Sequence, residues 1–332
     1  MKVLVTGGGG FLGQTITKQL LARKVDVVCL GRSHYPELSK LDVQLVRGDI
    51  ADSACVQDAA KDCQAIFHVA AKAGMWGKYE EYYSTNVVGT DNVITACRAN
   101  NIRKLIYTST PSVVHAGDDV EGSDEKLPYA TTFLAHYPKT KAMAEQKVLA
   151  ANNTELATIA LRPHLIWGPG DNHLAPRMIE RQRKGKLRLV GAGNNLVDSV
   201  YVDNAAQAHL QAFDKLDIGA ECSGKAYFIS QGEPLPLKIL MNGILASAGE
   251  KPVDRSVPPG IAYSLGAVCE VLYGLLGIQK EPLMTRFLAK QLATEHWFNI
   301  SAAKKDLGYD PKISIQEGLS RLKEYYNERN NA

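Results

Sequence analysis

The clearest chemical signal in the sequence is a tyrosine followed four residues later by a lysine. Tyr137 and Lys141 lie in the run HYPKTK, which opens a predicted helix. Side chains four residues apart lie on one face of a helix and are neighbours. An ammonium beside a phenol favours the phenolate, so we expect Lys141 to lower the pKa of Tyr137. A tyrosine tuned in this way gives or takes a proton near neutral pH.

Hydroxyl side chains gather at the end of a predicted strand at 104–107. The strand runs directly into the sequence TSTPS at 108–112. A strand is held by its apolar and β-branched residues and does not need this cluster of hydroxyls. One of them is therefore a candidate to hydrogen-bond the oxygen of a reacting carbonyl, beside a proton-donating tyrosine.

The elements that must position these residues begin at the amino terminus. An apolar strand at 2–6 breaks into glycines, and a helical pattern follows from residue 11. Gly7, Gly10 and Gly13 let the backbone turn off the strand, approach a pyrophosphate and pack the helix on the sheet. The free N–H groups of the first helical turn then face the phosphates. The alternative is a plain turn, because glycines punctuate many loops.

The residue that ends the next strand bears on the choice of cofactor. The strand at 26–31 ends in Gly31 and is followed by Arg32 and Ser33, where NAD enzymes place a carboxylate for the adenosine ribose. An arginine fork pairs with a 2′-phosphate, which a carboxylate would repel. The sequence therefore favours NADP (NADPH) over NAD. The alternative is that Arg32 is a surface residue stacked on the adenine.

These motifs together resemble the extended branch of the short-chain dehydrogenase/reductase superfamily, and within it the 3β-hydroxysteroid dehydrogenase/isomerase group. The glycine spacing G-x-x-G-x-x-G, the string TGGGGFLG, the pair Y-x-x-x-K and the closing LGYDP and EGL carry the resemblance. It implies an α/β fold, a Rossmann-type doubly wound parallel sheet with a smaller, mostly helical C-terminal lobe. We expect residues 1–170, with about 197–230, to form the NADP-binding domain. Residues 171–196 and 231–332 would form the substrate lobe.

The resemblance also assigns roles to single residues. Tyr137 donates the proton, Lys141 holds the nicotinamide ribose, and Thr110 polarises the carbonyl where serine is commoner; Ser109 and Ser112 are alternatives to Thr110. Asn86 lies near the nicotinamide end, or else it caps a helix. The full set of implied cofactor contacts is Gly7, Gly10, Phe11, Leu12, Gly13, Arg32, Ser33, Asp49, Ile50, Ala70, Ala71, Asn86, Tyr137, Lys141 and Pro163.

Three longer stretches resemble bacterial reductases of long-chain olefin biosynthesis. They are AAKAGMWG at 70–77, HLIWGPGD at 164–171 and FISQGEP at 228–234. The implied reaction is NADPH-dependent reduction of a 2-alkyl-3-oxoalkanoic acid to the 3-hydroxy acid. A fatty β-keto acid needs a carboxylate anchor, for which the candidates are His115, His164, His173 and Arg177.

Other activities stay open at this stage. A steroid or sterol dehydrogenase would use the same residues on another apolar substrate. A nucleotide-sugar epimerase or dehydratase is disfavoured by the apolar C-terminal stretch and by the missing acid at position 31. A non-enzymatic NADP sensor or scaffold is disfavoured because both Tyr137 and Lys141 are present.

Composition narrows the partners. The 332 residues carry a formal net charge of +3 and the basic residues are scattered, so nucleic acid is not indicated. The six cysteines show no C-x-x-C spacing, and we expect reduced thiols, no metal site and a cytoplasmic location. Strand residues begin at position 2, which leaves no room for a signal peptide.

One apolar stretch near the carboxyl end requires its own explanation. Residues 261–277 are almost entirely apolar, and the run is shorter than the ~20 residues that a bilayer span needs. We expect a buried helix that lines a substrate tunnel, with peripheral membrane contact or a dimer face as the alternatives. The resemblance implies a homodimer through the helices at 86–100 and 138–151; contact with a pathway enzyme is a further possibility.

Overall fold

The centre of the molecule is a seven-stranded parallel sheet. The computed structural model describes residues 1–115 and 117–331. The strand order is β12-β7-β5-β4-β1-β2-β3. The bounds are β1 Lys2–Thr6, β2 Asp26–Gly31, β3 Gln44–Arg47, β4 Ala65–His68, β5 Lys104–Thr108, β7 Ala157–Pro163 and β12 Lys225–Ile229. The expected doubly wound α/β fold is confirmed.

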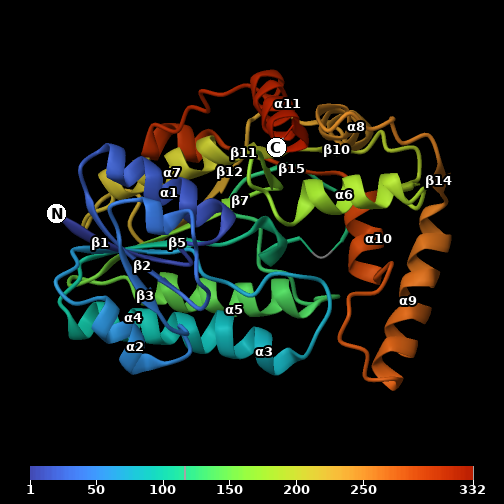
Figure 1. Ribbon diagram of the computed structural model, residues 1–332. Coiled ribbons are helices and arrows are strands. Elements are labelled where there is room, and N and C mark those ends of the chain that lie inside the picture. The colour runs from blue at the N-terminus through green and yellow to red at the C-terminus, as the bar shows by residue number, and fades with distance from the viewer. Residues whose placement is uncertain (116, 332) are drawn as a thin grey trace.

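Helices cover both faces of this sheet, as Figure 1 shows. On one face lie α1 (Phe11–Ala22) and α7 (Val202–Lys215). On the other lie α2 (Ser53–Ala59), α4 (Gly89–Ala99) and α5 (His136–Ala150). Strands buried on both faces must be apolar throughout, which is why β7 is buried at all seven positions.

The strand order reverses beside β1, because β2 lies on one side of it and β4 on the other. Chains leave the sheet in opposite directions at such a switch point, and a crevice opens at the carboxyl ends of the strands. Pro163, expected to end its strand, is the last residue of β7. The sheet therefore presents the ends of β1, β4, β5 and β7 along one edge.

The helix after β4 starts earlier than the sequence predicts. It begins with α3 (Tyr79–Tyr83), continues through a π-helical segment η2 (Ser84–Val88) and runs into α4. Asn86 consequently lies inside the helix and does not cap it. The π segment widens the helix by one residue per turn at this point, a feature often found at functional sites.

A second, smaller sheet lies beyond the carboxyl edge, in the order β13-β10-β15-β6. Its strands are β6 Val120–Ser123, β10 Leu196–Val197, β13 Leu235–Pro236 and β15 His296–Phe298. The polar, turn-rich sequence at 115–135 predicts a surface loop, and that prediction is wrong at β6. That strand pairs with β15, where Val120 faces His296, and a partner so distant in sequence leaves no local signal.

The remaining elements are short strands and the helices of the C-terminal half. The strands β8 Ile166–Trp167 and β11 Val200–Tyr201 pair with each other, as do β9 Leu189–Val190 and β14 Ser256–Val257. Single-turn helices are η1 Leu38–Lys40, η3 Pro111–Val113 and η4 Ala303–Leu307. The longer helices are α6 Leu174–Arg183, α8 Leu237–Ser247, α9 Pro259–Leu275, α10 Arg286–Ala293 and α11 Ile315–Asn331.

Two local predictions in this half are corrected. The polar residue before the apolar pattern at 205–213 predicts Asp203 as a helix cap, but α7 starts at Val202 and Asp203 lies in its first turn. A carboxylate there still suits the positive end of the helix dipole.

The second correction concerns α9, which is not the expected buried lining of a tunnel. Its buried residues are Ala262 and Gly266, whereas Ile261, Val271 and Leu275 are at least 61% exposed. The helix lies at the outer edge of the molecule beside α10 (Figure 1). Among the described residues, no helix has the length and apolar character needed to cross a membrane.

Candidate active site

A groove of about 450 Å³ follows the carboxyl edge of the large sheet. It brings together Thr110, Tyr137 and Lys141, the three residues for which the sequence predicts catalysis. It is also lined by all of the expected cofactor contacts except Ser33 and Asn86. Residues from six separate strand ends thus meet where the fold predicts a ligand.

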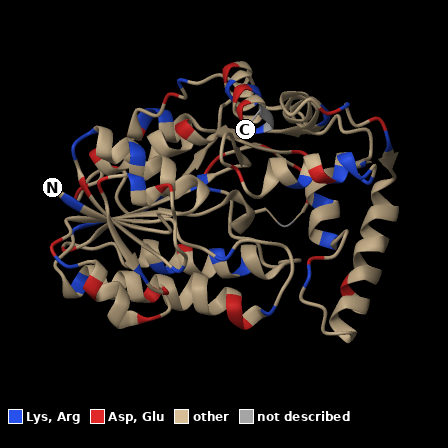
Figure 2. Ribbon diagram, viewed as in Figure 1, with Lys and Arg blue, Asp and Glu red and all other residues tan. Residues whose placement is uncertain are grey.

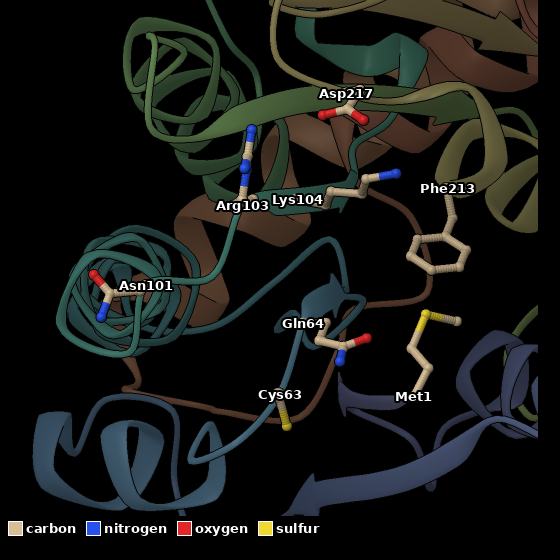
Figure 3. Close-up of a pocket in the computed structure, with 8 residues that line it drawn as sticks. All are labelled: Met1, Cys63, Gln64, Asn101, Arg103, Lys104, Phe213 and Asp217. Carbon is tan, nitrogen blue, oxygen red and sulfur yellow. The ribbon is translucent and has the colours of Figure 1, made fainter.

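A second hollow, of about 360 Å³, lies at the opposite ends of the same strands. Figure 3 shows its lining, which includes Met1 before β1, Gln64 before β4 and Lys104 at the start of β5. None of the predicted catalytic or cofactor residues lies there.

The glycine loop is shaped by contacts that no side chain would permit. Gly7 has φ +71°, and a Cβ there would lie 2.8 Å from the backbone of Ala70. A Cβ on Gly13 would lie 2.1 Å from the carbonyl oxygen of Gly7. Gly10 caps α1 without a side-chain hydrogen bond, so the first-turn N–H groups are not taken by a side-chain cap. This cradle fits the pyrophosphate of a dinucleotide.

Tyr137, on α5, and Thr110, just after β5, both line the groove. Burial raises the pKa of Tyr137 to about 12, and a hydrogen bond with Thr110 opposes that rise. The Thr110 hydroxyl also donates to Ser112 Oγ at 3.3 Å. The expected lowering of the Tyr137 pKa is therefore not found in the protein alone.

Burial of the phenol itself is the first reason for this correction, and Lys141, which was expected to oppose it, is buried as well. Its side chain is 2% exposed, and Nζ donates to the carbonyl oxygen of Thr108 at 2.6 Å and lies 4.0 Å from the centre of the Tyr107 ring. Burial lowers the pKa of Lys141 to about 7, although Glu145 opposes this. A lysine whose charged form is disfavoured by burial stabilises a phenolate less than a solvated cation does.

A buried ion pair behind Lys141 was missed by the sequence analysis. Glu145, one further helical turn along α5, is fully buried and accepts from Arg162 Nη2 at 2.6 Å and from Nε at 3.1 Å. Tyr129 donates to the same carboxylate at 2.7 Å. The spacing Tyr137, Lys141, Glu145 at four-residue intervals was a signal that this face of α5 is buried and polar.

At the adenosine end of the groove, Arg32 is largely exposed, and its Nη1 lies 3.8 Å from Asp49 Oδ2. Asp49 also accepts from the N–H of Ala51 at 2.9 Å. Tyr35, which the sequence analysis did not single out, lines the groove, and its ring lies where a Cβ on Gly9 or Gly31 would stand. The sequence signal for this role was an aromatic residue, Tyr35, a few positions after the strand β2.

Two expected cofactor contacts lie outside the groove lining. Ser33 is exposed on the loop after β2. Asn86 uses its side chain in the protein itself, accepting from Lys72 N at 2.7 Å and donating to Lys72 O at 3.0 Å and Thr140 Oγ1 at 2.9 Å. It ties the loop after β4 to α5, and its neighbour Thr85 lines the groove.

The four candidate carboxylate anchors have different surroundings. Both ring nitrogens of His115 are hydrogen-bonded, to Asp118 O and to Gln291 Nε2. Arg177 is exposed and pairs with Glu281 at 3.0 Å. His173 lies exposed at the rim of the groove. His164 follows the last residue of β7, is buried, and pairs through Nδ1 with Asp198.

Comparison with known proteins agrees with this geometry. Residues 4–256 match the model of the 3-beta hydroxysteroid dehydrogenase/isomerase family. The chain belongs to this family. It is 55% identical over 325 residues to the 2-alkyl-3-oxoalkanoate reductase of Stenotrophomonas maltophilia, covering 97% of this chain and 98% of that protein. It is 34% identical to the mouse sterol-4-alpha-carboxylate 3-dehydrogenase, decarboxylating, covering 96% of this chain and 89% of that protein.

Solved structures share the whole fold. The crystal structure of gox2253 superposes with a TM-score of 0.79 at 28% identity and covers 98% of both chains. A UDP-glucose 4-epimerase of Thermotoga maritima superposes with a TM-score of 0.77 at 20% identity, covers 99% of this chain and all of that one, and shows the fold alone. The expected family and fold are confirmed, and the chain is an oxidoreductase that uses a nicotinamide cofactor.

Proposed function

We propose that the protein reduces a 2-alkyl-3-oxoalkanoic acid to the 2-alkyl-3-hydroxyalkanoic acid, with NADPH as the cofactor. The observation that carries this proposal is the meeting of Tyr137, Lys141 and Thr110 in the groove of a chain 55% identical to a reductase named for that substrate. A role in long-chain olefin or hydrocarbon biosynthesis goes with it.

The names of two relatives support one feature of the substrate. In a 2-alkyl-3-oxoalkanoate, carbon 3 reacts and its neighbour, carbon 2, bears the carboxylate. In a sterol-4-alpha-carboxylate oxidised at carbon 3, the neighbouring carbon again bears the carboxylate. We infer that the substrate of this chain has the same arrangement, a carbonyl carbon next to the carbon that carries the acid.

In the proposed reaction, bound NADPH supplies a hydride to the ketone carbon. Thr110 donates a hydrogen bond to the ketone oxygen and so polarises the carbonyl. Tyr137 gives its hydroxyl proton to that oxygen as negative charge develops there. Lys141, one helical turn away, would hold the ribose of the cofactor, and the phenolate left on Tyr137 would regain its proton from solvent. The product is the 3-hydroxy acid, and the hydride and the proton account for both added hydrogens.

NADPH is proposed over NADH for two reasons, the presence of Arg32 and the glycine at the end of β2. Arg32 lines the adenosine end of the groove with its guanidinium largely exposed. β2 ends at Gly31, so the strand end itself carries no carboxylate to repel a 2′-phosphate, and the nearby Asp49 carboxylate lies 3.8 Å from Arg32. An arginine fork in this position suits a phosphate.

A sterol dehydrogenase remains the second candidate, because relatives with 34% identity over 96% of the chain are named so. The same residues would act, and a substrate panel separates the two. The likeness to epimerases rests on the fold, which does not carry an activity.

We also propose that the outer face of α9 rests on a lipid surface. Its exposed apolar residues include Ile261, Val268 and Leu275, whereas Ala262 and Gly266 are buried, and a Cβ on Gly266 would come 2.6 Å from the backbone of Thr285. Figure 2 shows that α9 is almost free of charged residues. Trp76 lies on the loop after β4, of which Ala71 and Ala73 line the groove. Its side chain donates to Ile278 O at 2.9 Å, and this bond connects that loop to the segment just after α9. An apolar substrate would enter from that side.

The assembly and the location of the protein are proposed from the resemblance and the sequence. A homodimer through 86–100 and 138–151 is expected, and its test is the mass in solution. A cytoplasmic setting agrees with six cysteines that are all free thiols in the structure.

The test of the proposed function measures NADPH oxidation with a 2-alkyl-3-oxoalkanoic acid, a 3-ketosterol and a UDP-sugar. We expect turnover with the fatty acid, and Tyr137→Phe should lower kcat by roughly 10²- to 10⁴-fold while the Kd for NADPH holds. Thr110→Ser keeps the hydroxyl and serves as the matched control. Equal turnover by the Tyr137→Phe enzyme would remove this tyrosine from the reaction.

A further inference from the structure

The ring of Tyr35 lies against two glycines at the adenosine end of the groove. An ideal Cβ on Gly9 would come 2.2 Å from Tyr35 Cδ1, and one on Gly31 would come 2.8 Å from Tyr35 Cε2. Gly9 follows β1, and Gly31 ends β2, the neighbouring parallel strand. Neither glycine has a positive φ, so the backbone does not require glycine at either position. The phenol ring is what leaves no room for a side chain at both.

The local structure after β2 holds the ring in this place. Pro36 follows Tyr35 and disfavours the helical conformation for it. The carbonyl oxygen of Tyr35 accepts from Leu38 N at 3.0 Å and from Ser39 N at 3.1 Å, where η1 begins. Leu38 is fully buried in the core and anchors this turn. The loop after β2 therefore sets the position of the ring.

The hydroxyl end of the ring takes the space of a side chain that NAD enzymes use. In those enzymes the residue at the end of this strand carries a carboxylate, which accepts from the 2′-hydroxyl of the adenosine ribose. Here that residue is Gly31, and a Cβ built on it would lie 3.0 Å from the hydroxyl oxygen of Tyr35. The phenol hydroxyl consequently lies where such a carboxylate would leave the backbone.

The Tyr35 hydroxyl is available to a ligand. Within the described part of the chain, the hydrogen bonds of Tyr35 all end on its backbone carbonyl oxygen, and its hydroxyl has no partner. The half-buried side chain lines the groove together with Gly31 and Arg32. A phenol hydroxyl is a hydrogen-bond donor without a charge, and the guanidinium of Arg32 is a cation. Donors of these two kinds suit an anionic group on the ligand.

We propose that the Tyr35 hydroxyl donates to the 2′-phosphate of NADPH, beside Arg32. The inference rests on the proposed function and adds to it a second residue that selects the phosphorylated cofactor. A carboxylate only accepts hydrogen bonds and so suits a free 2′-hydroxyl, whereas a phenol donates and suits a phosphate oxygen. Arg32 supplies the charge, and Tyr35 supplies a donor whose place is fixed by its loop. The glycine at position 31 makes room for this donor.

The experiment measures the Kd of two fragments by calorimetry, adenosine 2′,5′-bisphosphate and adenosine 5′-monophosphate. They differ in the 2′-phosphate, and both lack the nicotinamide. Tyr35→Phe keeps the ring and removes the hydroxyl. We expect it to raise the Kd for the bisphosphate roughly tenfold and to leave that for the monophosphate within twofold. Tyr83→Phe, at an exposed tyrosine of α3, is the matched control and should change neither Kd.

Salt separates the roles of Tyr35 and Arg32. Because a phenol is uncharged, the loss caused by Tyr35→Phe should be the same at low and at high salt. The loss caused by Arg32→Ala should shrink as salt rises, since salt screens an exposed charge. A loss in Tyr35→Phe that disappears at high salt would contradict a direct hydrogen bond.

Gly31→Ala tests whether the ring must occupy this space. The added methyl would lie 2.8 Å from Tyr35 Cε2 and so displaces the ring. We expect it to weaken the bisphosphate about as much as Tyr35→Phe does. The double variant should lose less than a further twofold, because both changes remove the same contact. Losses that multiply would overturn the shared space. The thermal midpoint verifies folding, and if Gly31→Ala does not fold, Tyr35→Phe decides.

The results also separate this inference from the proposed function. A wild-type protein that binds the bisphosphate no more tightly than the monophosphate contradicts the proposed preference for NADPH, and this inference with it. A wild-type protein that prefers the bisphosphate, with a Tyr35→Phe variant that keeps the full preference or weakens both fragments equally, overturns the role of Tyr35 alone. The substrate panel tests the reduction itself and does not depend on either outcome.

Discussion

Replacing Arg32 by alanine tests the cofactor preference, and the structure sets the size of the effect. A hydrogen bond between charged groups contributes about 1.5–3 kcal/mol. Because the Arg32 side chain is 64% exposed, solvent and salt screen it, and we take the lower figure of about 1.5 kcal/mol. That corresponds to a roughly tenfold higher KM for NADPH. NADH lacks the 2′-phosphate, so its KM should change less than twofold.

The assay follows absorbance of the reduced cofactor at saturating substrate, with both nicotinamides, at low and at high salt. The preference of the wild type for NADPH should shrink as salt rises, and the variant should show little salt dependence. Arg98→Ala, an exposed arginine on α4, is the control and should change neither KM. Equal rises in KM for NADPH and NADH after Arg32→Ala would refute the phosphate role.

Three further predictions concern the buried charges and α9. Glu145→Gln leaves Arg162 buried with its charge unpaired, so denaturant unfolding should show a loss of about 3 kcal/mol; Glu317→Gln, in an exposed pair with Arg321, should cost less than about 1 kcal/mol. Lys141 binds a proton more weakly when folded, with a pKa near 7 against 10.5 in the unfolded chain, so stability rises with pH between these values. Tm measured from pH 7 to 10 should therefore rise more for the wild type than for Lys141→Met, and parallel curves would contradict the lowered pKa. Val268→Asp with Leu272→Asp should abolish flotation with vesicles of phosphatidylcholine and phosphatidylglycerol, whereas Ile239→Asp, equally exposed on α8, should not. If the wild type fails to float and the paired variant instead halves its mass in solution, the face of α9 binds a second copy.

The cofactor half of the molecule was predictable because its signals are local. A strand, a glycine turn and a helix follow one another within 22 residues, and each has a short-range pattern. The carboxyl ends of parallel strands meet at one edge of a sheet. Spatial proximity between residues far apart in the sequence could therefore be predicted. Tyr137 and Lys141 were paired by their four-residue spacing and Thr110 was assigned by the family resemblance, and all three line one groove.

The failures involve distant partners and burial. β6 was missed because its partner β15 lies near the other end of the chain. The apolar pattern at 261–277 predicted the helix α9 correctly. It did not predict which face of α9 is buried, because periodicity does not show what a helix face contacts. The pKa of Tyr137 was misjudged because spacing shows the neighbouring lysine and hides the loss of solvent around both groups.

The polar face of α5 explains how the active-site tyrosine is oriented. Tyr137, Lys141 and Glu145 follow one another at single-turn intervals, and the two inner residues bind different strands of the sheet. Lys141 holds the end of β5 through Thr108 O, and Glu145 holds β7 through Arg162. Two anchors at successive turns fix the rotation of the helix about its axis as well as its distance from the sheet. The Tyr137 hydroxyl is therefore aimed by an ion pair two turns away, and a change at Glu145 should disturb its aim even in molecules that remain folded.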